Sequence, residues 1–156
     1  MGKETVNMPA RTISAFCADV ADTQWSRVTP IDQASPWLRA SQRQISELAQ
    51  LADNWDSYGS PPLQPAAIEH ASEALDCLST LQLPSPQIFP VPGGGIQLEF
   101  EKDRRELQIE FLPDGSIEYL KIASNGEMLE GSIPLSKGEL RCLAYWLQGK
   151  LEDFPF

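Results

Sequence analysis

Apolar and polar residues alternate along residues 96–133, and this alternation is the clearest structural signal in the chain. A period of two buries one face of each strand and leaves the other face in water. The apolar series consists of branched and aromatic side chains, beginning with Ile96, Leu98, Phe100, Leu107, Ile109 and Phe111. The pattern therefore predicts an antiparallel sheet that is covered on one face only.

The turn residues predict how these strands pair. Pro113-Asp114-Gly115 has the composition of a three-residue hairpin loop, in which glycine takes the left-handed position. That loop keeps the apolar positions on one face and places Glu110 directly opposite Glu118, whereas a two-residue loop would mix the faces. Asn125-Gly126 predicts a second tight hairpin, followed by a strand over residues 127–133.

Asp103-Arg104 predicts the closing turn of the first hairpin. With that turn in place, two more polar pairs meet on the exposed face, Gln97 beside Glu110 and Glu99 beside Gln108. The alternation slips at residues 119–122. The slip indicates either a β-bulge or a strand that is partly covered on both faces.

Three segments carry the spacing of amphipathic helices. The first begins at Ser35-Pro36, with serine as N-cap and proline in the first turn, and is expected to end near Asn54. The second begins at Pro65. The third opens with a capping box formed by Ser136 and Glu139.

Prolines at alternate positions force residues 84–92 into an extended chain that could only be the edge of a sheet, where it could add or receive a strand. We therefore predict an α+β fold, with a four-stranded antiparallel meander, two helices before it and a C-terminal helix packed on one face. Residues 35–156 are expected to form this single domain. Residues 1–34 lack sustained periodicity and are expected to form a partly ordered arm that packs Trp25 or Phe16 on the domain.

The charge of the chain argues against nucleic acid as a direct partner. The formal net charge is −10, from 22 acidic and 12 basic residues. Phosphate backbones are bound mainly through lysine and arginine, and the basic residues of this chain are dispersed. A basic protein is the partner that this charge favours.

The three cysteines are widely spaced and odd in number, which favours a reducing cytoplasm over a disulfide framework. Neither a signal peptide nor a long apolar run is evident, so we expect no membrane segment. His70 and Glu73 could offer only two metal ligands on one helix face. We therefore expect neither a metal nor another cofactor.

The polar face of the sheet is the first candidate site. Its members are predicted to be Gln97, Glu99, Glu110 and Glu118. One interpretation is a docking surface for a basic partner. The other is an ordinary solvated face whose charge is balanced by Lys121 or Arg105.

The second candidate site is the segment from Trp55 to Gly59, in which Trp55, Asp56 and Tyr58 stand between two helices. Loops held by rigid elements often carry binding residues. The alternative is a structural corner, in which Trp55 and Tyr58 fill the core while Asp56 or Ser57 caps a turn.

The Asn54–Gly59 segment and the Gly94–Phe100 strand together resemble a family of small uncharacterised bacterial proteins. The shared features are an N-W-D-x-Y-G turn before a proline-started helix, a G-G-x-x-L-E strand and a D-G hairpin. The resemblance covers roughly residues 42–148. It implies a bacterial, cytoplasmic setting, and because the family has no established activity, no functional residues carry over.

These observations favour a non-catalytic protein-binding module, of the kind found among antitoxins, immunity proteins and accessories of defence or anti-defence systems. Two alternatives stay open. A secretion-chaperone-like homodimer would need an exposed apolar groove. A small hydrolase would need two of the glutamates in a deep pocket with perturbed pKa values.

Overall fold

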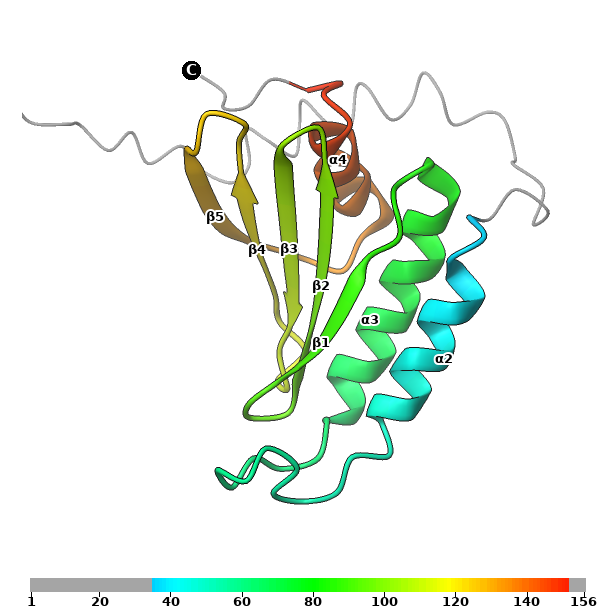
Figure 1. The fold of residues 1–156 in the computed structure, drawn as a ribbon, viewed down its shortest axis with the longest axis vertical. Helices are drawn as coiled ribbons and strands as arrows, with labels where there is room; N and C mark the ends of the chain where they lie inside the picture. The colour runs from blue at the N-terminus through cyan, green and yellow to red at the C-terminus, as the bar shows by residue number, and fades with distance from the viewer. Residues whose placement is uncertain (1–34, 152–156) are drawn as a thin grey trace, which may run out of the picture.

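The computed structural model describes residues 35–151, so the predicted arm at 1–34 and the last five residues of the predicted domain lie outside the described part. Figure 1 shows a five-stranded antiparallel sheet with helices on one side. The strands follow chain order and are β1 (Gln87–Val91), β2 (Gly95–Lys102), β3 (Arg105–Phe111), β4 (Ile117–Ile122) and β5 (Met128–Ile133). The helices are α2 (Leu38–Leu48), α3 (Pro65–Leu78) and α4 (Lys137–Leu147), with a short 3-10 turn η2 (Ser79–Leu81) after α3.

The α+β class is confirmed, but the prediction of four strands is wrong. The fifth strand is β1, which comes from the proline-rich segment and pairs antiparallel with β2 along its whole length. β1 lies at the edge of the sheet, where Pro90 is tolerated because its missing N–H leaves no ladder bond unmade.

The first helix is shorter than predicted. α2 begins at Leu38 and ends at Leu48, and Ala52, which continues the helical spacing of Ile45 and Leu48, is exposed beyond it. Ser35 does not cap this helix, because its hydroxyl donates to the Ser79 carbonyl 2.8 Å away. The predicted starts of the other two helices are confirmed. Pro65 lies in the first turn of α3, and at the start of α4 the Ser136 hydroxyl accepts from the Glu139 N–H at 3.1 Å.

The predicted registers are confirmed. Glu110 lies opposite Glu118 and opposite Gln97, and Glu99 lies opposite Gln108. The Leu112 N–H donates to the Ser116 carbonyl at 2.9 Å, which closes the three-residue loop. The hydrophobic spacing and the turn chemistry thus agree on one pairing.

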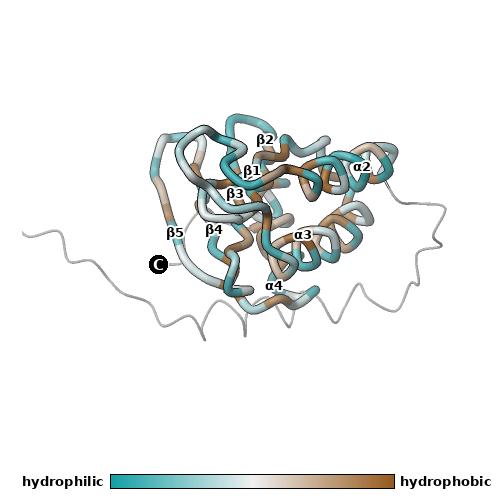
Figure 2. Tube along the Cα trace, turned by 90° about the horizontal axis from the view of Figure 1, so that it is seen from below, coloured by the Kyte–Doolittle hydropathy of each residue, from teal (hydrophilic) through white to brown (hydrophobic). Residues whose placement is uncertain are grey.

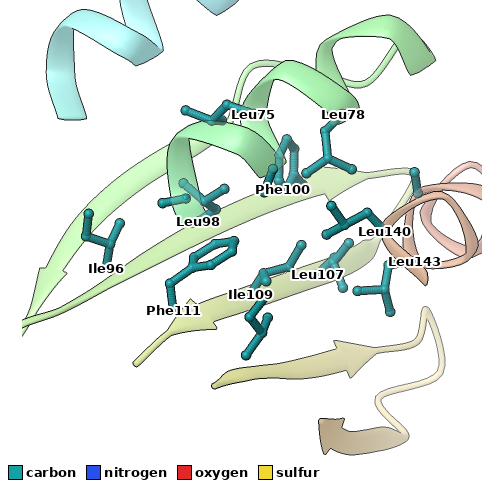
Figure 3. Close-up of a cluster of buried hydrophobic side chains, with 14 of the residues drawn as sticks. Leu75, Leu78, Ile96, Leu98, Phe100, Leu107, Ile109, Phe111, Leu140 and Leu143 are labelled. Carbon is teal, nitrogen blue, oxygen red and sulfur yellow. The ribbon is translucent and has the colours of Figure 1, made fainter. Parts of the chain in front are cut away.

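One hydrophobic core lies between the sheet and the helices. Leu75 and Leu78 of α3 and Leu140 and Leu143 of α4 point at the apolar face of the strands (Figure 3). Seen from below, hydrophobic stretches of the strand traces lie beside α3 (Figure 2). α2 lies outside α3 and contacts β1, with the Trp37 ring edge-on to Phe100 at 6.2 Å between centroids.

The slip at residues 119–122 is not a β-bulge. β4 pairs without interruption on both sides, so its side chains keep alternating. Lys121 falls on the helix face and is buried, while Leu120 and Ile122 are half-buried on the opposite face. A cation in an apolar position therefore produced the apparent slip.

Candidate functional site

The sheet face away from the helices, here called the open face, carries every glutamate of the five described strands. Strand side chains alternate between faces, and directly paired residues share a face. The registers therefore place on the open face Glu99, Glu101, Glu106, Glu110, Glu118 and Glu130. The three basic residues of the strands, Lys102, Arg105 and Lys121, fall on the helix face.

Four of the six acids of the open face stand opposite another acid on the neighbouring strand. Glu110 stands directly opposite Glu118, and Glu101 directly opposite Glu106. Like charges at opposed positions destabilise a sheet. The open face is therefore built at a cost in stability.

Glutamine side chains bond part of this face together. The Gln97 amide donates to a Glu99 carboxylate oxygen at 2.6 Å, and the Gln108 amide donates to Glu106 at 2.6 Å. No hydrogen bond from residues 35–151 reaches the carboxylates of Glu110 or Glu118. The acceptors of this pair are thus left for solvent or a partner, as are those of Glu101 and Glu130.

A hollow of about 530 Å³ lies over this pair. Three carboxylate residues and two glutamines surround a half-buried leucine there, and the lining is completed from β4 and β5 (Gln97, Gln108, Glu110, Glu118, Tyr119, Leu120, Glu130, Gly131 and Ser132). Partial burial, and then the negative charge of Glu118, raise the pKa of Glu110. The hollow therefore concentrates negative charge where water is partly excluded.

The interpretation that Lys121 or Arg105 balances this charge is wrong. Both cations lie on the helix face against the buried Trp146 ring, with the Lys121 ammonium and the Arg105 guanidinium each 5.3 Å from its centroid. Arg105 also donates to the Trp146 carbonyl in the last turn of α4 and to the Leu151 carbonyl beyond the helix. That position suits a cation because a helix C-terminus carries partial negative charge.

The second candidate site is a loop held by its own polar groups. Asp56 accepts from the N–H groups of Tyr58 and Ser60 and from the Ser60 hydroxyl, at 2.9, 3.1 and 2.5 Å. These hydrogen bonds lower the pKa of Asp56, the hydroxyl bond most. Asn54 accepts from the Gly59 N–H at 2.7 Å. Asp56 thus caps a turn, as the structural interpretation expects.

The same loop does not fill the core. Tyr58 is 93% exposed, so the prediction that Tyr58 is buried is wrong. Trp55 is half-buried, and its indole N–H donates to the Pro61 carbonyl at 3.0 Å. In Figure 1 this loop hangs below α2 and α3, and none of its residues lines the hollow. The two candidate sites are therefore separate.

The structure adds members to the acidic site that sequence reasoning missed, chiefly Glu101, Glu106 and Glu130. The Asn125-Gly126 hairpin could have predicted the position of Glu130. Its register pairs β5 with β4 and puts Glu130 opposite Leu120, on the open face. Within residues 35–151, no group of three His, Cys, Asp or Glu side chains could hold a metal ion. No helix of that part is long and apolar enough to cross a membrane.

Comparison with family models, curated proteins and solved structures gives no match to this chain. The resemblance to the bacterial family with the N-W-D-x-Y-G turn therefore stays a prediction. The function has to be argued from the open face itself.

Proposed function

We propose that this protein is a non-catalytic binding module whose open face docks a basic protein. The disulfide bond of Cys142 argues against the reducing cytoplasm that the cysteine spacing predicted. Antitoxins, immunity proteins and accessories of defence or anti-defence systems are the classes in which such a module would act. The proposal uses Gln97, Glu99, Glu110 and Glu118 of the predicted site and extends it to Glu101, Glu106 and Glu130.

The observation that carries this proposal is the pairing of Glu110 with Glu118, two acids opposed across adjacent strands. The fold does not require this pair, since neither side chain belongs to the core. A partner that places lysine or arginine over the pair would offset the repulsion. The two carboxylates would then have opposite charges beside them, which they lack in the free protein. Complementary charge would also steer the encounter and make it sensitive to salt.

The test uses two double variants with the same change in net charge. Glu110→Gln with Glu118→Gln neutralises the acid pair, while Glu47→Gln with Glu69→Gln neutralises two exposed acids on α2 and α3. Tagged proteins are used to capture partners from cell lysate at low and high salt, and the affinity of each captured partner is then measured. We expect affinity to fall at least about tenfold for the sheet variant only, with stability unchanged or raised. Equal affinity for the two variants would refute the proposal.

A small carboxylate-dependent hydrolase is the second candidate, because the hollow holds Glu110 and Glu118 together and the pKa of Glu110 is raised. A raised pKa is what a general acid requires. The hollow is open to solvent, however, so it would not exclude water from a reaction at the two glutamates. Hydrolysis of chromogenic glycosides or esters that is lost in Glu110→Gln would favour this candidate.

A secretion-chaperone-like dimer has less support. The large apolar side chains that are exposed within residues 35–151 are Tyr58, Phe89 and Met128. They come from a loop and from the two opposite edges of the sheet, so they form no continuous groove.

A further inference from the structure

The two edges of the sheet differ in how their backbone groups are covered. At the β1 edge, the Gln44 amide donates to the Ile88 carbonyl at 3.2 Å, and Pro90 has no N–H to offer. α2 packs against the same strand. The proline-rich edge predicted to add or receive a strand is therefore closed to strand addition by Pro90, Gln44 and α2.

At the β5 edge, the outward backbone groups can be assigned from the hairpin that precedes the strand. The Ala123 N–H donates to the Glu127 carbonyl at 2.8 Å, so this pair is hydrogen-bonded. Hydrogen-bonded and non-hydrogen-bonded pairs alternate along an antiparallel ladder. Leu129, Gly131 and Ile133 therefore bond to β4, while the outward N–H and C=O groups belong to Met128, Glu130 and Ser132.

These outward groups coincide with the open-face side chains. Met128, Glu130 and Ser132 are all exposed, and Met128 is 63% exposed. β5 is the last strand of the described sheet and carries neither proline nor lysine, the usual guards of an edge. Within residues 35–151 nothing bonds to these outward donors and acceptors, so an added strand would meet them next to the acidic hollow.

We propose that the basic partner binds as a sixth strand along β5, through an extended segment in which lysine or arginine alternates with apolar residues. This inference rests on the proposed function and specifies how the partner docks. In an antiparallel addition, the residue directly opposite Glu130 shares its face, so a cation there pairs with Glu130. Glu118 lies on β4, two strand spacings or about 10 Å from the added strand. The intervening residues fall on the helix side beside Leu129 and Ile133, where apolar side chains continue the core surface.

The probe is a short synthetic peptide in which lysine and valine alternate, studied with the full chain. Two versions carry N-methyl groups on alternate amides. Methylation of the lysine amides removes the donors that face β5, while methylation of the valine amides alters only the outer edge of the added strand. Affinity is measured by titration, and hydrogen exchange follows the amides of Met128, Glu130 and Ser132.

We expect the lysine-methylated peptide to bind at least about tenfold more weakly than the parent, and the valine-methylated peptide to bind like the parent. The parent should slow exchange at the three outward amides. Ser132→Pro removes one outward donor, and the preceding Gly131 has no Cβ to clash with the proline ring, so this variant should lose binding while Ser132→Ala keeps it. Unchanged exchange at Leu129 and Ile133 would show that the Pro variant is still folded.

The outcomes separate this inference from the proposed function. Suppose peptide affinity falls with Glu110→Gln and Glu118→Gln but not with lysine methylation, and the outward amides stay unprotected. Strand addition is then refuted and the acidic docking face stands. Edge protection that is indifferent to both glutamates would support strand addition and overturn the role of the acid pair.

Discussion

The raised pKa of Glu110 shows that the acidic open face is unfavourable for the folded protein. Its carboxylate is partly shielded from water and stands opposite Glu118, and both effects raise its pKa. Asp56 shows the opposite case, since the hydrogen bonds it accepts stabilise its charged form. Ionisation of Glu110 is therefore unfavourable in the folded protein, while ionisation of Asp56 is favoured by the loop that it caps.

The pH dependence of stability should reveal the difference. The folded pKa of Glu110 lies above its unfolded value, so between the two the folded state binds more protons and the free energy of unfolding falls as pH rises. Glu110→Gln should remove this contribution and gain stability relative to the wild type above the raised pKa. Urea denaturation between about pH 4 and pH 7 measures it. Glu69→Gln on α3 is the control, and an equal response of both variants would contradict the assignment.

At the scale of elements, the β1–β2 turn anchors the segment that leads into α3. The Gln64 N–H donates to the Gly94 carbonyl at 2.9 Å. A Cβ on Gly94 would lie 2.9 Å from Gln64 Cγ and 3.1 Å from the Pro62 carbonyl oxygen. Gly94 also has φ of +102°, so glycine is required there both for the backbone and for the close approach.

Substitution of the two neighbouring glycines separates these requirements. Gly93 has a similar φ of +96° but open space around its Cα. We expect Gly93→Ala to lower the free energy of unfolding by about 1 kcal/mol through backbone strain alone. Gly94→Ala should cost about 2–3 kcal/mol, because the contact with Pro62 and Gln64 is lost or forced apart. Denaturant titration measures both, and equal losses would show that the turn does not hold this segment.

The predictions at this scale succeeded where the signals were local. The β-hairpin registers follow from Pro113-Asp114-Gly115 and Asn125-Gly126, whose turn geometry needs no distant partner. The proline-rich segment of β1 was predicted to be extended and, within a sheet, an edge, but it was not counted among the four strands because prolines suppress strand propensity. Pairing with β2 overrode that low propensity. The end of α2 was misplaced because Ala52 continues the helical spacing although its side chain is exposed.

The whole molecule separates its strand charges between two surfaces. Six glutamates lie on the open face, and Lys102, Arg105 and Lys121 lie on the helix face. The formal net charge is −10, and in the free protein the carboxylates of the open face repel one another. This separation concentrates negative electrostatic potential over the open face, which the same net charge spread evenly over the surface would not do.

Salt should therefore stabilise the free protein while it weakens the complex. Screening of the open face at about 0.5 M salt is expected to add about 1 kcal/mol, or roughly 2–4 °C in Tm for a chain of this size. Thermal unfolding at several sodium chloride concentrations measures this effect. The double variant Glu110→Gln with Glu118→Gln should respond less than the wild type. A Tm that is independent of salt would show that the acids of the free protein do not repel one another measurably.

The sequence by itself determined the strand alternation, the turn types and hence the opposition of Glu110 and Glu118, because each depends on residues that are close along the chain. Only the tertiary structure decided where Lys121, Arg105 and Tyr58 lie. A cation can sit on either face of a sheet, and an aromatic can be buried or exposed. The choice depends on which surfaces the helices cover. Trp146 of α4 faces both cations, while no element of residues 35–151 covers Tyr58.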